Sequence, residues 1–222
     1  MGVAWPAAGY ATVISEDHSN AYWERAEIYD FVRRHGITGF GIVSGDRHSF
    51  WAGLAASSLP PKNFDPVGVA FVAGSISAPG YVEAFEHGLP KDHPLYALYL
   101  AQRSGDTKPR PIVNMLMRHG VRACLEYGRT GDISAARRLS NPELAPHPSF
   151  LDLAGHGYAI VRAAADVLEC EFVCIERPLE RAERDDGGPL RYRVVHRAGL
   201  WSAGQRPQLS QEILEGDAEF SI

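Results

Sequence analysis

The sequence has few cysteines, no long apolar run and no surplus of basic residues. Three cysteines among 222 residues are too few for the disulfide framework of a small secreted domain. No segment approaches the roughly 20 apolar residues of a membrane-spanning helix. The residues before Pro6 lack the basic group and apolar run of a signal peptide, so we expect none in this chain, and the localisation stays open. With 22 Lys and Arg against 27 Asp and Glu, the net charge is −5, and we expect no nucleic-acid binding from charge.

Common catalytic motifs are also missing. The sequence contains no Gly-x-Ser-x-Gly elbow, no Walker A loop and no His-Glu-x-x-His pair. Gly39 and Gly41 come close to a dinucleotide fingerprint, but they lie inside an expected strand rather than in a strand-to-helix turn. We therefore expect no dinucleotide cofactor at these glycines.

The composition is that of one globular domain. Hydrophobic residues make up 45% and charged residues 22% of the chain, an ordinary balance for a folded protein. A chain of this length can bury about two thirds or more of its unfolded surface. We place the domain at residues 1–203 and expect residues 204–222 to form a partly ordered tail.

The first part of the chain predicts a helix followed by two strands. Apolar residues recur at helical spacing over residues 22–35, and Gly36 follows as a stop. Two uncharged, largely apolar runs at residues 38–44 and 67–73 have the pattern of strands that are buried on both faces. We expect these strands to be neighbours in one sheet, with the helix packed on them.

The rest of the chain predicts short helices and then strands. Frequent prolines interrupt the pattern between residues 81 and 148. Helices are expected near residues 96–102, 113–127 and 133–139, and strands over residues 157–162, 168–176 and 191–197.

Two of the cysteines share one parity of a predicted strand. On a strand that rises roughly 3.3 Å per residue, Cys170 and Cys174 would lie about 13 Å apart, which is too far for a disulfide. We interpret both as buried, small apolar groups rather than as a metal-binding pair.

A candidate site follows the first predicted strand. The segment Gly45-Asp46-Arg47-His48 lies at its carboxyl end, where α/β proteins commonly build their sites. A carboxylate and an imidazole one residue apart can project toward one point. That donor pair suits Zn, Fe or Mn, and the carboxylate alone suits Ca or Mg. The pair can also act as base and orienter in a hydrolysis. The plainer alternative is an Asp that caps backbone amides beside a surface His.

The other histidines carry less information. His35, near a helix end, and His119, in a helix-like stretch, are interpreted as structural. Five more lie in loop-like stretches beside carboxylates or prolines and are not assigned as ligands: His18, His87, His93, His147 and His156.

Four motifs follow one another along most of the chain. They are the helix with Tyr22-Trp23-Glu24-Arg25, the strand end Ser44-Gly45-Asp46-Arg47-His48-Ser49, the segment Ala73-Gly74-Ser75-Ile76-Ser77-Ala78-Pro79-Gly80, and the series Asn141-Pro142, His147, Phe150 and Gly157-Tyr158. This ordered set resembles the alkaline phosphatase D (PhoD-like) family of metallophosphoesterases. In that family the second motif reads Ser/Thr-Gly-Asp-x-His and the third reads Gly-Pro-Ser-Ile-Thr-Ser-Pro-Gly.

The sequence departs from the family pattern in several places. Ser19 and Ala21 replace a usual Trp and Gly, and Ala70 replaces a usual acidic residue. The Tyr–Arg spacing is one residue shorter. The family's N-terminal half, with its Gly-Asp pair and its Asp-Asp-His-Glu-like segment, has no counterpart here. The resemblance therefore implies the C-terminal portion of such an enzyme.

The resemblance implies a fold and a function. The fold would be α/β (α+β), the C-terminal half of a metallophosphatase-type β-sandwich flanked by helices. The function would be metal-dependent hydrolysis of phosphate mono- or diesters, in which metals polarise a phosphoryl oxygen and activate water. By the same resemblance Asp46 and His48 would be catalytic and metal-binding, with His48 as the likelier direct ligand. Tyr22 and Arg25 remain structural.

Cofactors and partners follow from the same resemblance. The cofactors would be divalent or trivalent metal ions such as Ca, Fe, Zn or Mn, the substrate a phosphate ester, and the partner the missing N-terminal half of the domain. Family members are often exported. The alternative from another functional class is a catalytically incomplete fragment that lacks the N-terminal metal ligands and serves at most as a binding or structural module.

Overall fold

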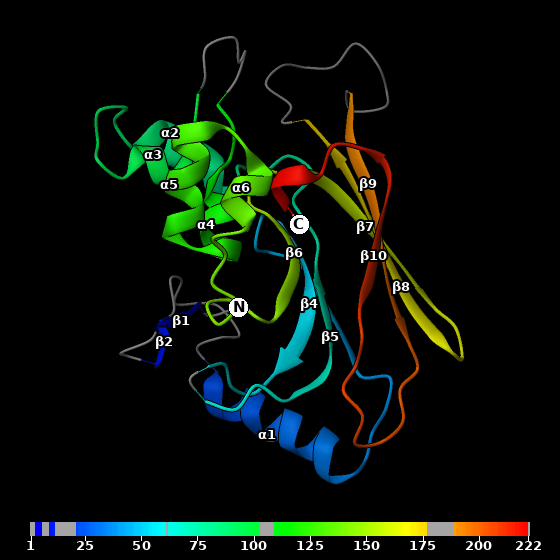
Figure 1. The fold of residues 1–222 in the computed structure, drawn as a ribbon. Helices are drawn as coiled ribbons and strands as arrows, with labels where there is room; N and C mark the ends of the chain where they lie inside the picture. Colours follow the sequence, from blue (N-terminus) through cyan, green and yellow to red (C-terminus); the bar gives the residue numbers. More distant parts are fainter. Residues whose placement is uncertain are drawn as a thin grey trace.

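The protein folds as two facing β-sheets with helices on the outer side of one of them. The computed structural model describes residues 3–5, 9–11, 21–60, 62–102, 109–176 and 189–221. Each of the two sheets has four strands, and a separate two-stranded pair lies near the amino end (Figure 1). This arrangement confirms the predicted α+β sandwich with flanking helices.

The elements follow one another in a mixed order. They are β1 (Val3–Trp5), β2 (Gly9–Ala11), α1 (Tyr22–Arg34), β3 (Gly41–Ser44), β4 (Phe50–Ala56), β5 (Pro66–Val72), α2 (Tyr81–Gly88), α3 (Tyr96–Tyr99), α4 (Val113–His119), α5 (Val121–Thr130), α6 (Ile133–Arg137), β6 (Pro148–Asp152), β7 (His156–Ala163), β8 (Val167–Ile175), β9 (Leu190–Gly199), β10 (Ser210–Gly216) and the short 3-10 helix η1 (Glu219–Ser221).

The first sheet has the order β3-β5-β4-β6. Strands β3 and β5 run parallel, with Val43 opposite Phe71, so the two predicted strands are indeed neighbours. Helix α1 packs on this sheet through Tyr29 and Val32, which share a core cluster with Val67 on β5. The predicted placement of helix and strands is therefore confirmed.

The prediction that both strands are buried on both faces is right for one strand and wrong for the other. Every residue of β5 is buried, whereas β3 is mostly exposed and Val43 is 55% exposed. The physical reason is position, because β3 lies at the edge of its sheet. The absence of charged residues predicted that β3 would be buried, but no described part of this chain covers it.

Strands β4 and β6 and helix α2 were not predicted. Strand β4 is rich in small residues, and its Gly53 lies so close to the chain that an added Cβ would stand 2.1 Å from the carbonyl oxygen of His147. Strand β6 begins at Pro148, a residue that strands accept at their first position or at an edge. Neither strand shows the alternation on which a sequence prediction depends.

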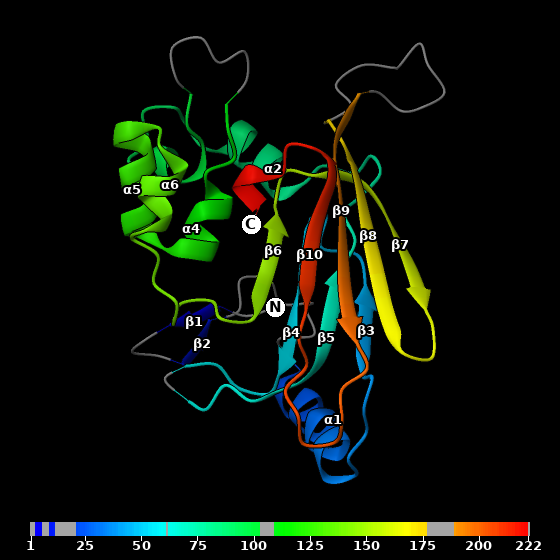
Figure 2. The same cartoon turned by 45° about the vertical axis from the view of Figure 1, so that its right-hand side comes forward.

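The second sheet is antiparallel, in the order β10-β9-β8-β7. Its strands β7, β8 and β9 confirm the three strands predicted for the last third of the chain. A tail was expected over residues 204–222, but its described part, up to Ser221, continues the fold, because Ser210–Gly216 form β10 against β9 and Ala218 is 2% exposed. Strand β10 is nearly all exposed, so its sequence lacks an apolar face that would have revealed it (Figure 2).

The main core lies between the two sheets. Phe50, Phe71 and Phe150 from the first sheet meet Phe172 and Tyr192 from the second in one cluster of buried residues. The opposite face of the first sheet is covered by helices. A second cluster joins β4, β5 and β6 to α2 and α4, and a third joins β4 and β5 to α1. The first sheet is therefore the middle layer of the molecule.

The cysteines occupy the core as predicted. Cys170 and Cys174 are fully buried on β8, and both are free thiols. Burial raises the pKa of each thiol to about 12, so neither forms a reactive thiolate at neutral pH.

The predicted helices are also present, but α3 ends at Tyr99 rather than near residue 102, α6 ends at Arg137 rather than near residue 139, and one helix is broken. The stretch expected at residues 113–127 is two helices, α4 and α5, separated by Gly120 with a φ of 91°, which favours glycine. Asp132 caps α6 by accepting a hydrogen bond from the Ala135 backbone. None of the helices in the described ranges is both long enough and apolar enough to cross a bilayer.

Candidate functional site

The candidate site lies where two parallel strands end. Strands β3 and β5 run in the same direction. The loop after β3 (residues 45–49) and the loop after β5 (residues 73–80) therefore both begin at the carboxyl ends of the strands, on the same side of the sheet. The backbone N–H of Ala73 donates to the Ser44 carbonyl at 2.9 Å. This bond holds the two loops side by side at their starting points.

Asp46 and His48 have an unusual backbone. Their φ angles are 67° and 47°, and in the described part of the chain every other residue with positive φ is a glycine. The left-handed conformation costs a residue with a side chain about 1–2 kcal/mol. Non-glycine residues held in such conformations concentrate at functional sites. The Asp46 side chain is exposed, and within the described ranges it forms no hydrogen bond or ion pair.

The His48 ring is oriented by the second loop. Its Nδ1 lies 2.6 Å from the carbonyl oxygen of Pro79. A carbonyl oxygen only accepts, so Nδ1 must carry the hydrogen, and in the neutral ring Nε2 keeps its lone pair. Histidines that bind metals commonly show this arrangement, with one nitrogen donating to a carbonyl and the other free to coordinate.

A buried acidic residue holds the same loop from the other side. Glu83, at the first turn of α2, accepts a hydrogen bond from the Gly80 backbone N–H at 2.8 Å through Oε2. Its Oε1 lies 2.8 Å from Nε2 of His156. Glu83 is 7% and His156 is 2% exposed. His156 also bridges to Ser75 of the loop, so the loop is anchored at both ends.

A second buried polar network connects all three layers. Asp152 is fully buried at the end of β6 and accepts bonds from Asn114 of α4 at 3.1 Å, Arg191 at 3.0 Å and Tyr192 at 2.9 Å, the last two on β9. Burial keeps the pKa of the Tyr192 hydroxyl well above its usual value, so it remains a donor. This network satisfies the carboxylate within the protein, and we interpret it as structural.

Sequence reasoning missed Glu83 and Asp152. For Glu83 a signal existed, because a glutamate three residues after a helix start matches one half of a capping box. For Asp152 the only local partner is the Ala154 backbone N–H among the described residues, and its side-chain partners come from residues 38 to 40 positions away.

The remaining predicted histidines have mixed environments. His35 bonds to its own helix through the Phe31 carbonyl, and His119 bonds to Ser140, both in agreement with a structural role. His93 accepts from the Leu95 backbone, and His87 is exposed. His18 lies outside the described residues.

The donors present do not form a complete metal site. Among the described residues, no group of three or more His, Cys, Asp or Glu side chains is placed to hold a metal ion. A catalytic metal needs about three protein ligands, and here Asp46 and His48 offer two. The described part of the chain could therefore supply only a share of the ligands of a metal centre.

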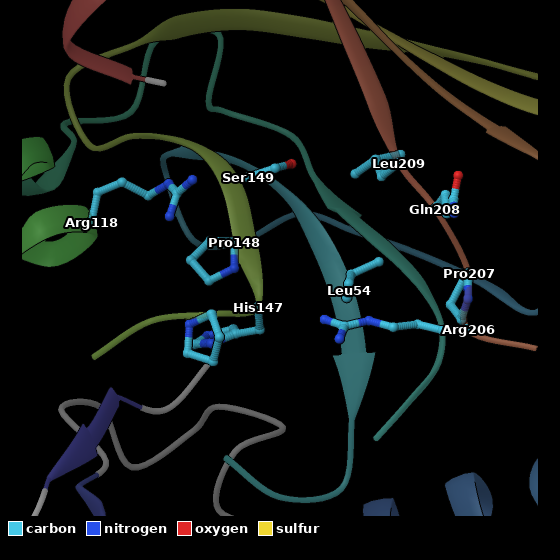
Figure 3. Close-up of a pocket in the computed structure, with 10 residues that line it drawn as sticks. Leu54, Arg118, His147, Pro148, Ser149, Arg206, Pro207, Gln208 and Leu209 are labelled. Carbon is cyan, nitrogen blue, oxygen red and sulfur yellow. The ribbon is translucent and has the colours of Figure 1, made fainter. Parts of the chain in front are cut away.

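A separate cavity of about 490 Å³ opens near the first residues of β6 (Figure 3). Its polar lining consists of Arg118, His147, Ser149, Arg206 and Gln208. Burial, together with the nearby Arg118 and Arg25, lowers the pKa of His147 to about 3, so this imidazole is neutral at physiological pH. The register of β4 against β6 places His48 and this cavity toward opposite ends of that strand pair.

The whole arrangement is an α+β sandwich with a candidate site at the carboxyl ends of two parallel strands. A solved structure titled "Structure of PhoD" matches it with a TM-score of 0.53 at 13% sequence identity, covering 99% of this chain and 32% of that chain. The chain thus has the fold of part of PhoD and spans about a third of its length. No protein-family model and no curated protein matches the sequence.

Proposed function

We propose that this chain is part of a PhoD-like enzyme that hydrolyses phosphate mono- or diesters with bound metal ions. Two independent lines support the proposal. Four sequence motifs resemble those of the family and follow one another in the same order, and the fold matches part of PhoD over 99% of this chain. The localisation depends on any targeting signal in the complete protein, and members of the PhoD-like family are often exported.

The left-handed backbone of Asp46 and His48 is the main observation that supports a functional site at these two residues. Both residues belong to the Gly-Asp-x-His motif, and both keep a conformation that is unfavourable for side-chain-bearing residues. A shared role for the carboxylate and for Nε2 of His48 accounts for the conformation.

The role of this chain in the reaction is limited to positioning and donation. Asp46 offers carboxylate oxygens, and His48 offers Nε2 because its Nδ1–H is held by Pro79. The further ligands would come from the N-terminal half of the complete domain. Bound metal ions would supply positive charge beside the phosphoryl group at this site.

Two observations favour the alternative of an incomplete fragment. The described residues gather no set of three ligand side chains, and the chain spans only 32% of PhoD. Without the remaining part, the chain would act at most as a binding or structural module. An upstream coding sequence with Gly-Asp-x-x-Tyr and Asp-Asp-His motifs would support the enzyme, and its absence would support the module.

The proposal is tested by comparing the purified 222-residue chain with the same chain joined to such an N-terminal half. We expect negligible turnover of aryl phosphate mono- and diesters by the chain alone with Ca, Fe, Zn or Mn, and clear turnover by the joined protein. If the chain alone still turned over substrate after trace phosphatases were removed, the proposal that the N-terminal half supplies the remaining metal ligands would be overturned. No turnover by a folded, metal-loaded joined protein would overturn the proposed function.

A further inference from the structure

We propose that Glu83 is a positioning residue that fixes the tautomer and orientation of His48 through one peptide group. The benefit of orienting His48 in this way rests on the proposed function, in which His48 binds a metal ion. The evidence for the positioning role is a continuous series of hydrogen bonds. His156 bonds to Oε1 of Glu83, Oε2 of Glu83 accepts from Gly80 N–H, and the Pro79 carbonyl accepts from His48 Nδ1.

The bond from Gly80 N–H to Glu83 and the bond from His48 to the Pro79 carbonyl involve the same peptide group. The carbonyl of Pro79 and the N–H of Gly80 belong to one planar amide, which turns as a rigid body. By holding the N–H at 2.8 Å, the Glu83 carboxylate fixes the direction in which the carbonyl faces His48. A negative charge on the N–H side also polarises the amide and strengthens its carbonyl as an acceptor.

Local packing leaves this peptide little freedom. A Cβ at position 80 would lie 3.1 Å from the His48 carbonyl oxygen, so the two loops are in close contact there. Glu83 and His156 are both buried, so water competes little for the outer bond. A helix cap alone would explain the bond to Gly80, but it would not require the second carboxylate oxygen to be paired with a buried histidine.

The test follows the His48 ring in the 222-residue chain by ¹⁵N-histidine NMR, at a pH well above the ordinary imidazole pKa. Signals are assigned by their loss in His48→Ala. We expect the Nδ1–H tautomer to dominate in the unmodified chain. In Glu83→Ala the Nδ1–H signature should give way to a mixture of tautomers. In Glu83→Gln, which keeps an acceptor but loses the charge, the change should be smaller and in the same direction.

The matched control is Glu27→Gln, an exposed carboxylate on α1, which should leave the His48 signals unchanged. If Glu83→Ala does not fold, the His48 tautomer in the isosteric Glu83→Gln variant tests the inference instead. A folded Glu83 variant with an unaltered His48 tautomer would overturn the inference. The readout needs neither metal nor turnover, so its failure is distinguishable from failure of the proposed phosphoesterase activity.

A second, independent observation concerns the cavity near β6. Two buried nitrogen atoms at its wall, Nε of Arg118 and Nδ1 of His147, have no hydrogen-bond partner among the described residues. Buried polar atoms are normally satisfied, so each such atom requires an explanation. His147 is 9% exposed, and Figure 3 shows Arg206 reaching back across Leu54 toward it.

The charge of this cavity is unbalanced. Arginines of the second sheet, Arg162, Arg193 and Arg197, are paired with the carboxylates of Glu169 and Glu171. The described lining of the cavity holds two arginines and no carboxylate. Arg206 instead lies over the Phe64 ring at 4.8 Å.

The geometry points to a binding site for a phosphoryl oxyanion, distinct from the loop that carries His48. Its donors come from α4, from the start of β6 and from the segment before β10. They therefore surround the cavity from several directions, as a tetrahedral anion requires. Guanidinium groups are the preferred partners of phosphate oxygens.

The test titrates the 222-residue chain with inorganic phosphate at constant ionic strength and follows the arginine Nε–H and histidine signals. We expect saturable shifts at Arg118 and His147. The affinity should be at least several-fold weaker in Arg118→Gln and in Arg206→Gln, and unchanged in the exposed control Arg34→Gln. A non-saturable response, or equal affinity in Arg118→Gln, would overturn the site. Tighter binding of acetate than of phosphate would overturn the choice of ligand in favour of a carboxylate.

Discussion

Two histidines of this protein show how one residue type serves opposite roles. His48 is partly exposed and oriented by the Pro79 carbonyl, whereas His196 is fully buried among aromatic rings, with Phe172 at 4.8 Å and Phe150 at 5.2 Å. The spacing Asp46-x-His48 could be recognised in the sequence. The Pro79 contact could not, because it joins residues 31 positions apart and depends on the parallel pairing of two strands.

His196 makes the stability of the fold sensitive to acid. Burial lowers its pKa from 6.5 to about 3, so between these values the unfolded chain binds a proton that the folded chain does not. The free energy of unfolding therefore falls as the pH drops through this window, by up to about 1.4 kcal/mol per pH unit. His147, whose pKa is also about 3, adds to the slope.

Replacing His196 with phenylalanine should reduce that dependence. In denaturant unfolding between the two pKa values, we expect His196→Phe to show a shallower loss of stability with falling pH than the unmodified chain. His35→Ala, which removes an exposed imidazole, should keep the original slope. An unchanged slope in His196→Phe would contradict the interpretation.

At the scale of elements, the sequence predicted those strands and helices whose own residues carry the signal. Strands β8 and β9 alternate or are apolar, and α1 has a helical stripe, so all three were expected. Strand β4 is rich in small residues, and β10 is an exposed edge strand, so their formation depends on neighbouring strands that a local sequence pattern does not describe. The same limit explains why β3 was expected to be buried.

The exposed edge at β3 predicts association of the isolated chain. Gly41–Ser44 contains no charge and presents Val43 to solvent, and an uncharged edge strand invites pairing with another chain. Val43→Lys should lower self-association measured by sedimentation, without loss of the folded spectrum. The matched control is Val161→Lys on β7, an edge strand that already carries Arg162. Equal effects of the two substitutions would contradict this account of β3.

At the scale of the molecule, one carboxylate connects the three layers. Asp152 on β6 bonds to Asn114 in the helical layer and to Arg191 and Tyr192 in the second sheet. Asp152→Ala would leave Arg191 without its buried counter-charge, a change that typically costs about 3–5 kcal/mol. Chemical denaturation should show this loss, whereas Glu126→Ala, which breaks the exposed pair with Arg129, should change little. A small effect at Asp152 would contradict its linking role.

The sandwich and its helical flank were predictable because four motifs of the chain resemble those of a larger family in the same order. The site at Asp46 and His48 stays a prediction. The completeness of the site was not predictable, since the sequence names two donors and the fold brings no third to them within the described ranges. The proposed role of Asp46 and His48 therefore has to be tested in the presence of the proposed N-terminal half.

The most direct measurement is the metal content and turnover of the joined protein with His48→Ala or with His35→Ala, at matched folding. Loss of a ligand should lower metal occupancy and reduce turnover of an aryl phosphate ester by orders of magnitude. His35 bonds only within its own helix turn, so its loss should cost a little stability and leave turnover nearly intact. Equal and small effects of the two substitutions would remove His48 from the metal centre and contradict the account.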